Sequence, residues 1–298
     1  MWIVKKEEFV RKDQKFYDSL EDRKKAEIEH SDRRRQIVTG YEYFTDASKT
    51  NEDVNYVVNE EEYNEHFSNA KFYSITKSSF AYRDSLVYPR VKGYVALDYC
   101  CGNGEIGIAM AVSGAAKVHG IDISEVSIRN AEALALEASV GKVCNYEVMD
   151  AENLTYKDNT FDLVHEYGAL HHVDLEASLK EVARVLKPDG KFVCTEALRH
   201  NPLIHAYRKR SMHLRTVWEV DHILGVPNIM QGKKYFENVK VRYFHLFALA
   251  AIPFRKFFFF SAMLAVLDSI DTIVLKIPLI RRLAWVAVIE YSNPRQNP

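Results

Sequence analysis

Short apolar runs alternate with amphipathic stretches from Val95 onward. Five runs have the length and composition of buried strands: VALDYC, KVHGIDI, CNYEVMD, FDLVHEYG and KFVCTEAL. Three intervening stretches place apolar residues at helical spacing: EIGIAMAVSG, SEVSIRNAEALALEAS and LEASLKEVARVLK. Such alternation predicts an α/β fold, with a parallel sheet covered by helices on both faces.

The rhythm changes after Ala197. The next segment is predicted to be helical and carries many basic residues and histidines, RHNPLIHAYRKRSMHLRTVWEVDHIL. Two late strands are predicted, VKVRYFHLFAL and AWVAVIEYS, and an apolar, helical segment over residues 252–280 lies between them. A hairpin-like pair of late strands is not part of an ordinary dinucleotide-binding fold.

The N-terminal residues 1–40 are densely charged with mixed sign. Apolar residues recur on nearly one side, which predicts one long amphipathic helix: Ile3, Phe9, Val10, Phe16, Tyr17 and Leu20. This arm either packs on its own domain or exchanges with a neighbouring subunit, which would make the protein a homo-oligomer. Residues 41–90, rich in tyrosine and asparagine, are predicted as a helical or irregular lid. Residues 91–298 form the main domain, with helical insertions at about 200–235 and 250–280.

The composition bears on which partners, metals and cell compartment to expect. The 298 residues are 47% hydrophobic and carry a formal net charge of -1, which gives no reason to expect a nucleic-acid partner. The four cysteines fit no zinc spacing, so we expect reduced thiols, no metal site and a cytoplasmic location. The N-terminus lacks the apolar stretch of a signal peptide. The longest apolar run, FFFFSAMLAVL, is too short to span a bilayer, so we expect a soluble protein with affinity for something apolar.

A glycine-rich loop follows the first predicted strand. In VALDYCCGNGEIG the glycines Gly102, Gly104 and Gly107 are spaced GxGxxG, and Asp122 ends the next strand. That carboxylate would hold a ribose hydroxyl in a dinucleotide and in S-adenosylmethionine alike. The glycines and Asp122 therefore predict a nucleotide cofactor without identifying it.

Three features favour S-adenosylmethionine over a dinucleotide as the cofactor. Asp98, just ahead of the glycines, would repel a pyrophosphate and attract a cationic sulfonium. Asp150 and Ala151, at the end of the third strand, suit the adenine amino group and a ring nitrogen. LKPDG, residues 186–190, is predicted as a turn into the fifth strand.

Together these motifs resemble the class I S-adenosylmethionine-dependent methyltransferases, over residues 80–198. DYCCGNG is similar to the glycine loop of that family, GIDIS to its ribose-binding strand end, MDAEN to its adenine contact, and FDLVHEYGALHHV to its fourth strand and following loop. The resemblance implies a Rossmann-like sheet of seven strands with the last one reversed. It implies S-adenosylmethionine as cofactor, bound by Asp98, Cys100, Gly102, Gly104, Asp122, Ile123, Asp150, Ala151, Glu152 and Glu166.

Cys100 departs from the family, which usually has glycine at this position. If the position needs a positive φ, a cysteine is strained by about 1–2 kcal/mol. We expect instead that the loop is slightly displaced and that Cys100 packs beneath the cofactor as an inert thiol.

His171 and His172 follow the fourth strand, where ligands bind in open α/β sheets. Either imidazole could take a proton from an acceptor near neutral pH. Both could instead be structural, and His200, His205 and His213 are alternative bases.

Exclusion points to a small-molecule acceptor. The loop after the fourth strand lacks the Asn/Asp-Pro-Pro-aromatic motif of amino-methylating DNA enzymes, and the chain lacks the paired-glutamate loop of arginine methyltransferases. The apolar segment 252–280 would suit an apolar or aromatic natural product, isoprenoid or lipid. Similarity to methyltransferases of specialised metabolism, including the teleocidin type, leaves C-methylation of a prenyl chain open. A non-catalytic cofactor-binding subunit, an NAD-dependent oxidoreductase and a protein that contacts a membrane surface are the other hypotheses.

Overall fold

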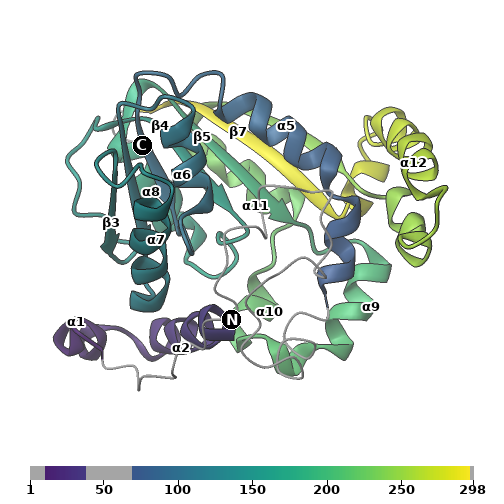
Figure 1. Cartoon of the computed structure of the whole chain (residues 1–298). Helices are drawn as coiled ribbons and strands as arrows, with labels where there is room; N and C mark the ends of the chain where they lie inside the picture. Colours follow the sequence, from purple (N-terminus) through teal and green to yellow (C-terminus); the bar gives the residue numbers. More distant parts are fainter. Residues whose placement is uncertain (1–10, 38–68, 296–298) are drawn as a thin grey trace.

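A seven-stranded sheet forms the centre of the protein (Figure 1). The computed structural model describes residues 11–37 and 69–295. The strands are β1 (Val95–Tyr99), β2 (Lys117–Asp122), β3 (Cys144–Val148), β4 (Phe161–Tyr167), β5 (Leu186–Ala197), β6 (Phe236–Phe244) and β7 (Val286–Pro294). Every predicted strand is present, and the α/β fold is confirmed.

The strand order is β3-β2-β1-β4-β5-β7-β6. Strands β1 to β5 are parallel, whereas β7 lies antiparallel between β5 and β6. The predicted reversed last strand is therefore confirmed. Strand β5 begins earlier than predicted, because Leu186 already pairs with Phe161 and the register shifts before Lys191 pairs with Leu163. The segment LKPDG is thus an irregularity within the strand pairing, not a turn outside it.

Helices cover both faces of the sheet. They are α1 (Gln14–Ser19), α2 (Asp22–Ile37), α5 (Lys77–Val87), α6 (Glu105–Val112), α7 (Glu125–Glu137), α8 (Leu175–Val185), α9 (Pro202–Arg210), α10 (Val217–His222), α11 (Val226–Gln231) and α12 (Phe260–Val274), with 3-10 turns at Ala70–Ile75, Met212–Leu214, Gly232–Lys234, Ala248–Phe254 and Ile280–Leu283. Alternate strand residues enter two cores. Leu97 packs in the core that contains α8 and α11, and its neighbour Ala96 in the core that contains α5, α6 and α7.

The N-terminal arm differs from the prediction. Its described part is two helices, since Leu20 adopts an extended conformation that ends α1 before α2 begins. The stripe residues Phe16, Tyr17 and Leu20 are not buried in α1, while Ile3, Phe9 and Val10 lie outside the described residues. Figure 1 shows α2 lying across one end of the molecule, beside α10.

The buried face of α2 is largely charged. Lys24, Glu27 and Asp32 are buried along it, together with Ile28. None of the stripe residues lies in α2, and this helix packs its charged side chains over a polar cavity and not over a hydrophobic core.

The insertion before β7 exposes a large apolar surface. Helix α12 projects from the side of the molecule away from α1 (Figure 1). Its exposed apolar side chains, with those flanking the helix, are Phe257, Phe258, Phe259, Val266, Ile270, Ile273, Ile277 and Leu279. We call this the α12 surface. None of the helices within residues 11–37 and 69–295 is long and apolar enough to cross a membrane.

Candidate active site

A cavity of about 360 Å³ lies at the carboxyl ends of the parallel strands. This is where an open α/β sheet binds ligands, because the loops there diverge. The predicted residues that line it are Cys100, Asp122, Ile123, Asp150, Ala151, Glu152, His171 and His172. Asn103, Glu105 and Glu196 also line it and were not predicted.

Asp122 organises the glycine loop from the end of β2. Its carboxylate accepts hydrogen bonds from the backbone N–H of Gly102 at 3.0 Å and of Ser124 at 2.8 Å. Burial raises the pKa of Asp122. A desolvated carboxylate in this position is suited to a hydroxyl or cationic partner in the cavity.

Two further carboxylates follow β3, and cations of the arm pair with both. Lys24 Nζ lies 2.7 Å from Asp150 and 2.9 Å from Glu152. Arg23 lies 2.8 Å from Glu152. A ligand that uses these carboxylates must therefore exchange with arm cations or bind beside them.

The same arm reaches the glycine loop. The Arg35 guanidinium occupies the space that a side chain at Gly102 would need. Asp32 accepts a 2.6 Å hydrogen bond from the Ser124 hydroxyl at the start of α7. Helix α2 thus forms one wall of the cavity along its cofactor side.

Asp98 and Gly104 act from behind the cavity and do not line it. Asp98 accepts a hydrogen bond from Gly107 N at 2.8 Å and lies 3.3 Å from His165 Nδ1. Gly104 has φ +79°, and a Cβ there would lie 2.7 Å from the Tyr146 hydroxyl. Asp98 therefore holds the start of α6 in place from behind the cavity.

Cys100 corrects one expectation. Its φ is 56°, so the cysteine takes a left-handed conformation and the expected displacement of the loop, which would avoid it, does not occur. Such a residue is strained by about 1–2 kcal/mol. Burial raises the pKa of its thiol well above the ordinary value, as expected for an inert side chain facing the cavity.

Glu166 was predicted beside the cofactor but lies behind the cavity wall. It is completely buried and accepts hydrogen bonds from the backbone N–H of Ala169 and Leu170. Glu196, at the end of β5, lines the cavity instead and accepts from Leu170 N at 2.6 Å. Burial raises the pKa of both carboxyls. A carboxylate ending the next strand was the sequence signal for Glu196, but only the pairing of β4 with β5 sets it beside the loop.

His171 and His172 are both held by carboxylates and both line the cavity. His171 Nδ1 lies 2.8 Å from Glu196, and His172 Nδ1 lies 2.8 Å from Glu27 of the arm. Because an ionised carboxylate only accepts, each Nδ1 carries the hydrogen and each Nε2 has its lone pair available. Burial lowers the pKa of His171 to about 3 and that of His172 to about 4. Both imidazoles are therefore neutral at pH 7, although they are weaker bases than the ordinary value suggests.

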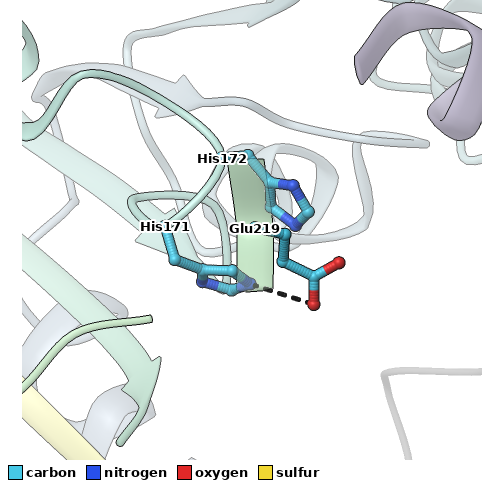
Figure 2. Close-up of side chains that lie close together, drawn as sticks. All are labelled: His171, His172 and Glu219. Atoms are coloured by element: carbon cyan, nitrogen blue, oxygen red, sulfur yellow. Dashed lines mark ion pairs between the residues drawn. The ribbon is translucent and has the colours of Figure 1, made fainter. Parts of the chain in front are cut away.

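Glu219 of α10 completes this cluster. Figure 2 shows both imidazole rings beside its carboxylate, and His171 Nε2 lies 4.0 Å from Glu219. The ligand atoms of His171, His172 and Glu219 lie within 4.8 Å of one another and could hold a metal ion. Glu219 also pairs with Arg215. Sequence reasoning missed this set because Glu219 is distant from the histidines in the chain.

The far side of the cavity is mostly apolar. Phe72, Phe80, Ile204, Tyr207 and Trp285 line it. The alternative bases His200, His205 and His213 do not line the cavity. The cavity thus joins a carboxylate-rich end to an apolar end, with the two histidines on its wall.

The sequence is similar to proteins of known function. The family described as Methyltransferase domain matches residues 90–249. The 27-O-demethylrifamycin SV methyltransferase of Amycolatopsis mediterranei (strain S699) is 39% identical over 103 residues, which are 34% of this chain and 38% of that protein. The chain spans less than half the length of the curated relatives it matches.

Two solved structures share the fold. A phosphoethanolamine N-methyltransferase 2 of Haemonchus contortus, bound to S-adenosylhomocysteine, aligns with a TM-score of 0.54 at 20% identity, over 78% of this chain and 57% of that chain. A geranyl diphosphate C-methyltransferase of Streptomyces coelicolor A3(2) aligns with a TM-score of 0.52 at 11% identity, over 78% of this chain and 81% of that chain. At these identities the likeness extends to the fold alone.

Proposed function

The chain belongs to the class I S-adenosylmethionine-dependent methyltransferase family, and we propose that it methylates a small apolar or aromatic acceptor. Transfer is an in-line displacement, in which the acceptor atom forms a bond to the methyl carbon as the bond to sulfur breaks. The product is S-adenosylhomocysteine. The observation that carries this proposal is one cavity that joins the carboxylates Asp122, Asp150 and Glu152 to an apolar wall.

The residues present fit the cofactor. Asp122 would hold the ribose hydroxyls, Asp150 would accept from the adenine amino group, and Ala151 and Ile123 would contact the ring from the strand ends. Cys100 would lie beneath the cofactor, and Glu152 beside it. Gly102 would leave room for the Arg35 guanidinium beside the loop, and Gly104 would allow the tight turn that packs on Tyr146. Asp98 and Glu166 would support the loops from behind. S-adenosylmethionine supplies the activated methyl group, so the chain needs only to align the reactants and manage a proton.

Proton transfer falls to the two histidines. We assign Nε2 of His171 or His172 as the atom that takes the acceptor proton, since Glu196 and Glu27 hold the two Nδ1 atoms. Helix α2 would exclude water by covering the cavity. For C-methylation of a prenyl chain, the same atom would take a proton after the transfer.

Calorimetric titration with S-adenosylhomocysteine tests the proposal, with NADH as a parallel control. Micromolar binding of S-adenosylhomocysteine alone supports it and justifies screening apolar acceptors for methyl transfer. Binding of NADH alone would contradict it and favour the oxidoreductase hypothesis. Cofactor binding without turnover on any acceptor would favour the non-catalytic subunit.

The α12 surface favours contact with a lipid surface. Its exposed aromatic residues include Phe258, which is 98% exposed, and basic residues adjoin it at Arg255, Lys256, Lys276, Arg281 and Arg282. Exposed aromatic residues with flanking cations suit an anionic membrane interface. Co-sedimentation with anionic liposomes should fall in Phe258→Ser and persist in Leu136→Ser, a change at an exposed site on α7. Equal recovery of both variants would contradict lipid contact.

The arm and the cysteines bear on assembly and location. The described part of the arm packs on its own chain, and exchange with a second subunit remains a proposal. Deletion of residues 1–37 should lower the mass by light scattering if the arm exchanges, and an unchanged mass would contradict exchange. All four cysteines are free, which supports a reducing, cytoplasmic location.

A further inference from the structure

A buried guanidinium faces the apolar end of the cavity. Arg208, in the last turn of α9, is 9% exposed and lines the cavity. Its Nη1 donates to the carbonyl oxygen of Leu198 at 2.8 Å. Within the part of the chain that the structure describes, Arg208 forms no ion pair.

The acidic groups nearby are already engaged. Glu196 accepts from His171, Glu27 accepts from His172, and Glu219 pairs with Arg215. Arg215 adds a second guanidinium to this end of the cavity, and its Nε has no hydrogen-bond partner. Burial and the neighbouring Arg215 lower the pKa of Arg208 to about 10, so it remains charged at neutral pH.

The carboxylate of Glu196 is close enough to raise the pKa of Arg208, but it is bonded to His171 and forms no ion pair with the guanidinium among the described residues. A buried guanidinium without a direct ion pair is costly, and a ligand that supplies the opposite charge would offset that cost. A guanidinium presents its donors in a planar fork that matches a carboxylate or a phosphate. The carbonyl oxygen of Leu198 engages one donor of Arg208, Nη1, and the residue lines the cavity.

The same helix also supplies apolar contacts. Ile204 and Tyr207 of α9 line the cavity, together with Phe72 and Trp285. The Phe72 ring lies 4.8 Å from that of Tyr207 and 5.6 Å from that of Trp285. An apolar wall beside a buried cation suits a ligand with an apolar body and an acidic group.

We propose that the acceptor is an amphiphilic acid whose carboxylate or phosphate binds Arg208, with its apolar body against Phe72, Tyr207 and Trp285. This rests on the proposed function and specifies its substrate class. Arg208 is a binding residue that sets the position of the acceptor, and the methyl-accepting atom then lies on the side of His171 and His172.

The test is calorimetric titration of the full chain saturated with S-adenosylhomocysteine. The probes are octanoate, octyl phosphate and octanol, which share one apolar chain and differ in the head group. We expect octanoate or octyl phosphate to bind at least about tenfold tighter than octanol. The better of the two acids identifies the head group. Equal affinity for all three probes would overturn the proposal.

Substitutions in α9 test whether Arg208 is the residue that causes the preference for an acid. Arg208→Met should remove the preference for the acid and leave octanol and S-adenosylhomocysteine binding unchanged. Arg210→Met is the matched control, since Arg210 is exposed on the same helix, and it should keep the preference. If Arg208→Met fails to fold, Arg208→Lys keeps the charge without the fork and should retain a weaker preference. An undiminished preference in the folded Arg208 variant would overturn the assignment.

Failure of the acidic-acceptor proposal can be told apart from failure of the proposed methyltransferase function. Failure of the chain to bind S-adenosylhomocysteine would contradict the methyltransferase proposal. Binding of S-adenosylhomocysteine with no preference for the acids would contradict only the acidic acceptor.

Discussion

The two ends of the cavity are built in opposite ways. The cofactor end takes Asp122 from the last position of β2, and Asp150 and Glu152 from the turn that follows β3, so each side chain lies within a short local motif. The acceptor end combines Phe72, Arg208 and Trp285, which are far apart in the sequence. The first end is acidic and suits a cationic cofactor, whereas the second is apolar with buried cations. The residues of the proposed cofactor end therefore come from local sequence motifs, whereas those of the proposed acceptor end are brought together by the packing of distant segments.

The largest effect is expected at the histidines between the two ends. Replacing the catalytic member of the pair, in His171→Gln or His172→Gln, should lower kcat by about 10²–10⁴-fold, with KM and S-adenosylhomocysteine affinity little changed. His205→Gln, on the exposed side of α9, is the control. Steady-state kinetics with an identified acceptor measure the effect, and a loss below about tenfold in both variants would exclude a base at this site.

The pKa values of His171 and His172, lowered to about 3 and about 4, also predict how kcat depends on pH. The neutral form of each imidazole should persist as the pH falls to about 5. A fall in kcat between pH 7 and 5 would therefore report protonation of Glu196, whose pKa burial raises to about 7, and not protonation of the imidazoles. If the cluster with Glu219 instead holds a catalytic metal ion, EDTA should abolish turnover. We expect turnover to survive EDTA.

The next largest effect is expected at the acidic end. Asp122→Ala removes the carboxylate that accepts from Gly102 and Ser124, so the affinity for S-adenosylhomocysteine should fall by about 10–100-fold. Calorimetry measures the affinity, and circular dichroism checks that the fold is intact. Asp189→Ala, at an exposed position in the first part of β5, should leave the affinity unchanged. Unchanged affinity in Asp122→Ala would contradict this cofactor placement.

Glu105 tests the electrostatics of the same end through stability. Burial raises its pKa from 4.5 to about 7, opposed by Arg35 of the arm. The folded chain therefore holds a proton that the unfolded chain releases, and stability falls as the pH rises between 4.5 and 7. Glu105→Gln should raise the free energy of unfolding by about 2–3 kcal/mol at pH 8.

At pH 4, where Glu105 is protonated in both states, the substitution should have no effect. Urea denaturation at the two pH values measures the difference. Glu132→Gln, on the exposed face of α7, is the control. Equal stabilisation at both pH values would show that packing and not charge is responsible.

The smallest effect is expected from the arm. Lys24 pairs with Asp150 and Glu152. Lys24→Met should leave Asp150 without its cation, while Arg23 still pairs with Glu152, and should tighten S-adenosylhomocysteine binding by about 3–10-fold. Lys25→Met, which removes a cation that pairs with Asp22 on the same helix, is the matched control. Weaker binding in Lys24→Met would show that the arm cation assists the cofactor instead of competing with it.

Several features of the site could be predicted from the sequence because they depend on neighbours in the chain. Strand ends and their turns place Asp122, Asp150 and Ala151 at the cavity without help from distant segments. Glu166 lies one residue before the end of β4 and is buried away from the cavity, so its predicted place beside the cofactor stays a prediction. Whether a side chain near a strand end faces the cavity or the core depends on the loop that follows. The expected displacement of the loop at Cys100 was wrong, because the glycine loop imposes a positive φ even on a residue with a Cβ.

The sequence by itself determined the seven-stranded α/β fold, since the period of the apolar residues sets each strand and helix. It also determined the acidic cofactor end, since those carboxylates belong to contiguous motifs. Only the tertiary structure decided where α2 lies, which acids hold the two histidines, and that Arg208 is buried without an ion pair among the described residues. The physical reason is that burial and charge pairing are properties of side chains brought together from distant positions, and no local pattern in one chain records them.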